Sequence, residues 1–190
     1  MSDIIHPGAG VLYMKVGTHA REDLKAIIAR KRREIDEAGF AMWGYGGNTC
    51  HPRSMVQPFA KDLAAQGQPI HLVMHEMNSR HYAEAVRAER YSVDGTTWEK
   101  IPQAINVLGS RFALMIKDLR EHRDELDLAS TRVGVGRNQG RLGSRYVQGQ
   151  ADKACLLVTE PEQINEERKP VQIDLVAELI DPYAVFLSEK

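Results

Sequence analysis

Hydrophobic positions in the first quarter of the chain predict a strand, a helix and a second strand. The apolar run Val11 to Val16 is partly β-branched and is followed by Gly17, a pattern that predicts a short strand. A helix is expected next, with Thr18 as its N-cap and Gly39 at its end. Its apolar residues at helical spacing are Leu24, Ile27, Ile28 and Ile35. Phe40 to Tyr45 then returns to a strand pattern.

The following stretch changes from helical spacing to strict alternation. Ser54 to Gln66 predicts a second helix, with Pro58 in its first turn, where a missing amide is tolerated. Gly67 ends this helix, and the period becomes two from Ile70 onward. One side of the resulting strand holds Ile70, Leu72 and Met74, and the other holds His71, Val73 and His75.

The middle of the chain is rich in strand patterns. Val86 to Ile101 predicts a hairpin whose turn is Asp94-Gly95, a pair that readily supplies the positive φ angles of a type I′ turn. Two further strands are expected at Arg111 to Leu119 and at Glu125 to Val133. The charged segment Arg120 to Asp124 would be the loop between them.

The last third predicts a loop, a strand, an exposed segment and a terminal strand. Gly134 to Gly149 has loop composition, and Lys153 to Thr159 has strand composition. Residues 160–170 are charged and bracketed by prolines, which predicts an exposed loop. Val171 to Leu187 alternates and would add a strand to the same sheet or to that of a partner.

These elements predict a single α+β domain over residues 1–190. Two helices in the N-terminal half and about eight strands favour a mixed, strongly curved sheet or a small β-barrel. The regular alternation of strand and helix that builds a doubly wound nucleotide-binding fold is missing.

Composition narrows the function classes. The chain has 25 basic and 26 acidic residues and a formal charge of −1, so it is not a protein that coats nucleic acid through bulk positive charge. Two cysteines are too few for a disulfide framework or a four-cysteine zinc site. No signal peptide and no run of about 18 apolar residues is present, which predicts a cytoplasmic protein that does not span a membrane.

Two glycine-rich windows are the strongest functional signal. The second window, residues 132–146, has four arginines and no acid, and arginine binds phosphate in a bidentate manner. Candidate ligand residues there are Arg137, Arg141, Arg145 and Tyr146, with Lys153 and Arg111 as further candidates at strand edges. The segment is not a Walker A loop, because no Gly-Lys-Ser/Thr follows at the needed spacing. The alternative is a solvated basic loop with turn glycines.

The first window, residues 43–52, places two aromatic residues beside flexible backbone. Trp43 and Tyr45 share strand parity and precede Gly46, so they could stack on a base, a contact that contributes roughly 1–3 kcal/mol. The alternative is ordinary core packing of both rings. Trp98, close to the predicted turn, is a third candidate wall of a pocket.

Histidine and cysteine positions leave a hydrolase as a rival. Cys50 could act as a nucleophile with His51, His71 or His75 as its base. His71 and His75 would lie about 13 Å apart along one strand, too far to share a metal ion. We therefore expect neither a metal nor a cofactor.

Two segments resemble a known group of binding domains. Arg111 to Leu128, and the opening Leu12 to Val16 strand followed by a helix, are similar to parts of EVE and PUA-like domains. That resemblance covers about a quarter of the chain and implies a small curved-sheet or barrel fold that binds RNA or modified bases.

The sequence therefore predicts a binding module for a nucleotide, a modified base or a short segment of RNA or DNA. The Cys/His hydrolase is one alternative. A homo-oligomeric assembly protein, with exposed arginines at an interface, is the other.

Overall fold

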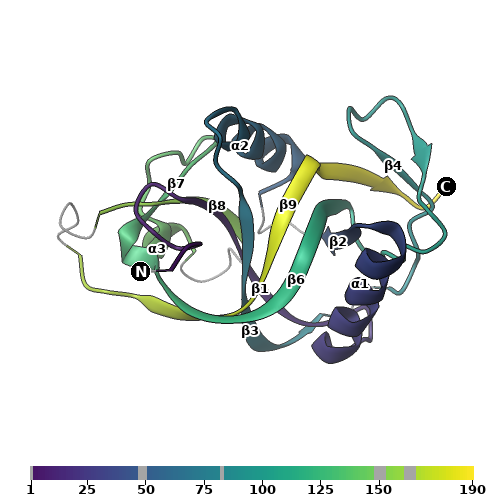
Figure 1. Ribbon diagram of the computed structural model, residues 1–190, viewed down its shortest axis with the longest axis horizontal. Coiled ribbons are helices and arrows are strands. Elements are labelled where there is room, and N and C mark those ends of the chain that lie inside the picture. Colours follow the sequence, from purple (N-terminus) through teal and green to yellow (C-terminus); the bar gives the residue numbers. More distant parts are fainter. Residues whose placement is uncertain (1, 47–50, 82–83, 148–152, 161–165) are drawn as a thin grey trace.

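The computed structural model describes residues 2–46, 51–81, 84–147, 153–160 and 166–190. Within them the fold is α+β, with three helices and one mixed sheet of nine strands (Figure 1). The main path of the sheet runs β2-β6-β9-β3-β1-β8-β7, and the β4–β5 hairpin joins it through β9. The strands are β1 (Gly10–His19), β2 (Ala41–Tyr45), β3 (His71–His81), β4 (Arg90–Ser92), β5 (Glu99–Lys100), β6 (Phe112–Asp127), β7 (Thr131–Val133), β8 (Lys153–Val158) and β9 (Pro170–Ser188). Only β1 and β3 pair in parallel, and all other described pairs are antiparallel.

The sheet is open. Its path ends at β2 and β7, and these two strands do not pair in the described part of the chain, so it is not the closed barrel of one prediction. β9 pairs with β6 along one edge and with β3 and β4 along the other. The C-terminal strand therefore adds to its own sheet, as the first of the two predicted arrangements requires.

The first two helices form where the sequence predicts them, with corrections at their starts. α1 (Leu24–Ala38) is capped by Asp23, whose carboxylate accepts from the Ala26 amide at 2.8 Å, and not by Thr18, which lies in β1. Gly39 ends α1 with φ +83°. In α2 (Arg53–Ala65), Pro58 lies in the helix interior and not in the first turn.

Alternating side chains divide the core between the two faces of the sheet. Ile70, Leu72 and Met74 pack with apolar residues of both α1 and α2, whereas Val73 packs in a second cluster with Tyr13. α1 and α2 therefore cover the same face of the sheet. The second cluster lies under the N-terminal segment and α3 (Gly143–Tyr146).

Three predictions about residues 86–149 are wrong in detail. Residues 112–127 form one strand with register shifts, so the charged segment 120–124 is strand and not loop. It remains extended because β9 pairs with Arg120, Glu121 and Asp124, with a register shift between the last two, while most of its polar side chains reach solvent. In the β4–β5 hairpin, six residues separate the strands, and Asp94 is absent from the positive-φ residues, so the turn is not type I′. The predicted loop 134–149 contains α3.

A buried ion pair fastens α1 to the segment that follows the hairpin. Lys31 is 2% exposed, and its Nζ lies 3.0 Å from Glu34 Oε2 and 2.8 Å from the carbonyl oxygen of Asn106. Glu34 also accepts from the Asn106 amide at 2.9 Å. Burial lowers the pKa of Lys31 to about 8, against the opposing effect of Glu34.

Candidate functional site

The two glycine-rich windows, separated by about 80 residues of sequence, come together around the start of α2. The ring of His51, just before the helix, lies 5.1 Å from the Tyr146 ring by centroids. Met55, in the first turn of α2, faces Gly136, and Phe59, one turn further along the helix, faces Gly134. We call this region, formed by residues 51–59 with residues 134–147, the α2 junction.

The glycines of the second window allow this close approach. A Cβ on Gly134 would lie 2.4 Å from Phe59 Cε2, and one on Gly136 would lie 3.0 Å from Met55 Sδ. Gly140 has φ +87° in the turn that returns the chain to α3. Packing and turn geometry thus explain these glycines, and only the charged side chains on this segment point to a ligand.

Three arginines of the second window are exposed on the segment that packs on α2. Arg137, Arg141 and Arg145 are all exposed, and only Arg145 has an acidic partner among the described residues, Glu166. Lys153 is half-buried at the start of β8, and its carbonyl oxygen accepts from the His51 amide at 3.4 Å.

A second basic group flanks the other side of the first turn of α2. The guanidinium of Arg53 lies 5.1 Å from the centroid of Phe186, and that of exposed Arg111 lies 5.4 Å from the centroid of Phe112. The Phe112 and Phe186 rings are 6.0 Å apart, so the two cations lie over neighbouring rings. Gly46 is adjacent: a Cβ there would be 3.3 Å from the Arg111 amide nitrogen.

The backbone adds positive potential between these groups. Pro52, the N-cap of α2, has no side chain that could cap the helix, and the first turn has no acid. In the described part of the chain, no acceptor binds the amides of Arg53 and Ser54. Because free amides and the helix dipole favour anions at a helix N-terminus, this end of α2 attracts negative charge.

The sequence around the junction lacks acids. Residues 38–61 and residues 128–151 contain no Asp or Glu, in a chain with 26 acids among its 190 residues. These are the two stretches that meet at the junction, so no acid from either stretch neutralises its arginines.

His51 is a buried, neutral hydrogen-bond donor at the junction. It is 3% exposed, and its Nδ1 accepts from the Cys155 backbone amide at 3.0 Å. Burial lowers the pKa of His51 to about 4, so the ring is uncharged at neutral pH. With Nδ1 accepting, the proton of the neutral ring lies on Nε2.

The aromatic side chains of the first window are part of the core. Trp43 is 5% exposed and Tyr45 is 2% exposed, and both belong to the cluster that α1 and α2 cover. The structure therefore shows the core packing that was the alternative to stacking on a base. Trp98, by contrast, is 38% exposed.

The residues of the hydrolase alternative are not assembled in the described part of the chain. Cys50 lies outside the described residues. His71 and His75 are on β3, where burial lowers the pKa of His71. The backbone carbonyl oxygen of Gln172 lies 2.7 Å from His75 Nδ1. Cys155 is fully buried, which raises the pKa of its thiol. No group of three or more His, Cys, Asp or Glu residues that could hold a metal occurs among the described residues.

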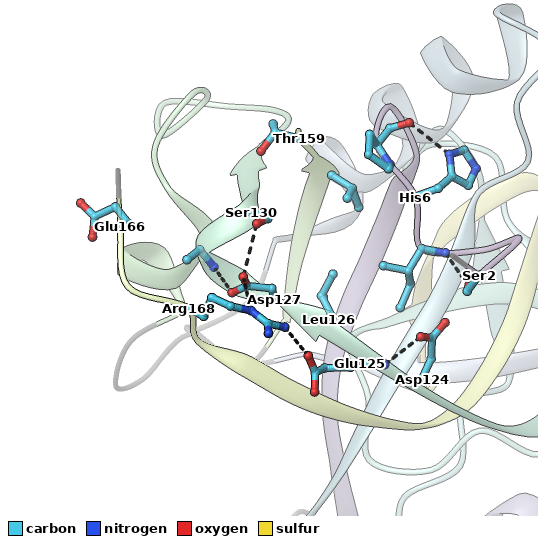
Figure 2. Close-up of a pocket in the computed structure, with 14 residues that line it drawn as sticks. Ser2, His6, Asp124, Glu125, Leu126, Asp127, Ser130, Thr159, Glu166 and Arg168 are labelled. Carbon is cyan, nitrogen blue, oxygen red and sulfur yellow. Dashed lines mark hydrogen bonds and ion pairs between the residues drawn. The ribbon is translucent and has the colours of Figure 1, made fainter. Parts of the chain in front are cut away.

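A separate hollow of about 520 Å³ lies between the N-terminal segment and the end of β6 (Figure 2). Its acids include Asp124, Glu125, Asp127 and Glu166. In Figure 2 the guanidinium of Arg168 reaches Glu125, and it also pairs with Asp127 at 3.4 Å. The excess of carboxylates makes this hollow unsuited to an anionic ligand.

Comparison with known proteins does not point to a function. The chain matches no protein-family model, and no curated protein or solved structure is significantly similar to it. No helix in the described part of the chain is long and apolar enough to cross a membrane.

Sequence reasoning missed Arg53 and the role of His51 beside the helix. The signal that could have found Arg53 is the absence of acids over residues 38–61. The donor role of His51 has no sequence signal, because it depends on the amide of Cys155, 104 positions away.

Proposed function

We propose that the protein binds a phosphate-bearing ligand, a nucleotide or a short nucleic-acid segment, at the α2 junction. The observation that carries this proposal is the meeting of two acid-free segments around a helix N-terminus. The segment that packs on α2 carries exposed Arg137, Arg141 and Arg145, of which Arg145 is paired with Glu166, and Arg53 and Arg111 lie over neighbouring rings beside the first turn of the helix.

The chemistry of these groups suits a phosphate and not a cationic ligand. Arginine guanidinium groups offer planar pairs of donors to phosphate oxygens, and the first amides of α2 add donors whose positions the helix fixes. Burial keeps His51 neutral, and the hydrogen bond from the Cys155 amide to Nδ1 leaves its proton on Nε2. The arginines and the first amides of α2 thus offer a dianion donors from both side chains and backbone.

The test is a calorimetric titration with the ribonucleoside monophosphates and with inorganic phosphate. Removing Arg141 and Arg145 together, by substitution with Ala, is expected to weaken binding at least tenfold, because a hydrogen bond to a charged group contributes about 1.5–3 kcal/mol. Arg33→Ala is the matched control, since Arg33 is an exposed arginine on α1, which lies at the other end of the molecule from α3 (Figure 1).

Mass spectrometry of the supernatant from heat-denatured protein complements the titration by identifying a co-purified ligand. Equal affinity of the double variant and the wild type for every nucleotide would refute the proposal. A lower affinity of Arg33→Ala would show that general charge, and not the junction, attracts the ligand.

A further inference from the structure

A second hollow, of about 470 Å³ and with a mostly basic lining, lies beside the β4–β5 hairpin. It is lined by Glu89, Arg90, Trp98, Lys100 and Lys190, so three cations and one acid surround an aromatic ring. Trp98 is one of four large apolar side chains that are exposed in the described part of the chain, with Met77, Val86 and Val93. An indole face with cations around it is suited to a base and its phosphates.

The core of the protein does not need the Trp98 ring. The hairpin is anchored instead by Tyr91, which packs against the cluster of Ile101 and Val185 and donates its hydroxyl proton to Glu99 at 2.6 Å. Trp98 lies at the end of the hairpin loop, with more than a third of its surface open to solvent. The exposed part of the ring can therefore contact a ligand.

The hairpin loop is held in one shape by its own hydrogen bonds. Asp94 accepts from the amides of Thr96 at 2.8 Å and Thr97 at 2.7 Å, and the Gly95 amide donates to Ser92 Oγ at 2.8 Å. These bonds fix the backbone just before Trp98. A ligand that stacks on the ring consequently meets a loop that is already ordered.

The hairpin loop also touches the first turn of α2. The Arg53 guanidinium donates to the carbonyl oxygen of Val93 and lies over the Phe186 ring. Gly95 packs on the same ring, since a Cβ at Gly95 would be 3.3 Å from Phe186 Cε2. Figure 1 shows α2 and the hairpin on the same side of the molecule, with β9 between them.

We infer that the α2 junction and the Trp98 hollow form one continuous track for single-stranded nucleic acid. Phosphates bind along Arg141, Arg53 and the lysines of the hollow, and one base stacks on Trp98. This inference rests on the proposed function and deepens it: a polymer occupies both sites at once, whereas a mononucleotide occupies only the junction. A base can therefore stack on exposed Trp98, whereas Trp43 and Tyr45 are buried in the core.

The experiment is a fluorescence titration of the full chain with three probes. They are uridine monophosphate and oligomers of about 16 nucleotides, one of oligouridylate RNA and one of oligothymidylate DNA. The chain has two tryptophans, and Trp43 is 5% exposed, so quenching by a stacked base reports on Trp98. The oligomers are expected to quench emission, and the monophosphate is expected to bind without quenching.

The variants separate stacking from charge. Trp98→Ala is expected to weaken oligomer binding, measured by anisotropy of a labelled oligomer, by roughly 5- to 150-fold, and to leave the affinity for the monophosphate unchanged. Trp98→Phe keeps an aromatic face and should restore most of the affinity. Met77→Ala, a loss of another exposed apolar side chain, is the control and should bind like the wild type.

The outcomes distinguish this inference from the proposed function. If Trp98→Ala binds the oligomers like the wild type while the Arg141 and Arg145 double variant binds neither the monophosphate nor the oligomers, the junction binds nucleotides and the track is refuted. If wild-type protein binds neither monophosphate nor oligomer, both proposals fail. A preference for RNA over DNA supports the track and adds contacts to the 2′-hydroxyl, whereas equal affinity supports recognition of backbone and base faces alone.

Discussion

Acid should destabilise the protein through His51, and the structure gives the size of the effect. His51 is buried at the junction, with Nδ1 accepting from the Cys155 amide, so protonation of Nδ1 would remove that hydrogen bond and place a charge in the core. Burial lowers its pKa from 6.5 to about 4 in the folded state. Because the unfolded chain binds the proton more tightly, the stabilisation is fully present above pH 6.5 and is lost as the pH falls towards 4.

The loss at pH 5 is about 2 kcal/mol, since 1.5 pH units below the unfolded value correspond to 1.36 kcal/mol each. The assay is urea unfolding of the wild type and of His51→Asn between pH 7.5 and pH 5. Asn keeps an oxygen that can accept from the Cys155 amide and does not titrate. The free energy of unfolding of the wild type should fall relative to that of His51→Asn by this amount.

His6→Asn is the control for this experiment, because His6 is exposed and has no part in the junction. This variant should retain the full acid dependence of the wild type. Parallel pH profiles for the wild type and His51→Asn would show that the His51 ring is not the buried neutral group described above, and would remove it from the list of donors for a phosphate.

Two further predictions concern the packing that holds the site. Lys31→Ala leaves buried Glu34 with Arg30 Nε, at 3.7 Å, as its remaining cation, and should lower the free energy of unfolding by about 3 kcal/mol, the lower end of the cost of breaking a buried ion pair. The Lys31→Met/Glu34→Leu double variant should recover a large part of that loss in the same urea titration. Gly134→Ala places a methyl group against Phe59 and should cost about 1–3 kcal/mol by thermal unfolding, whereas Gly134→Ala combined with Phe59→Leu should be closer to the wild type. A double variant that is less stable than the single one would contradict the reasoning in either case.

Local patterns in the sequence determined the early elements of the fold. The spacing of Leu24, Ile27 and Ile35, with Gly39 after them, gives α1, and the alternation from Ile70 to His75 gives β3 with its two faces. These features follow from the period of each element and from the freedom of glycine to adopt positive φ at a helix end. They need no information from distant residues. The strand ending at Tyr45 and the one starting at Lys153 were predicted on the same basis.

Tertiary structure decided the features that depend on distant partners. The charged segment 120–124 is strand because β9 pairs with it, and its own residues only predict a polar loop. Trp43 and Tyr45 are buried because α1 and α2 cover their face of the sheet, while the hairpin leaves Trp98 exposed; nothing in the local sequence distinguishes these rings. Likewise, the sequence shows two acid-free, glycine-rich segments, but only the packing of Gly134 and Gly136 on α2 brings them together. Composition can indicate which residues have the chemistry of a phosphate site, whereas their proximity is a property of the folded chain, because side chains far apart in sequence meet only when the elements that hold them pack.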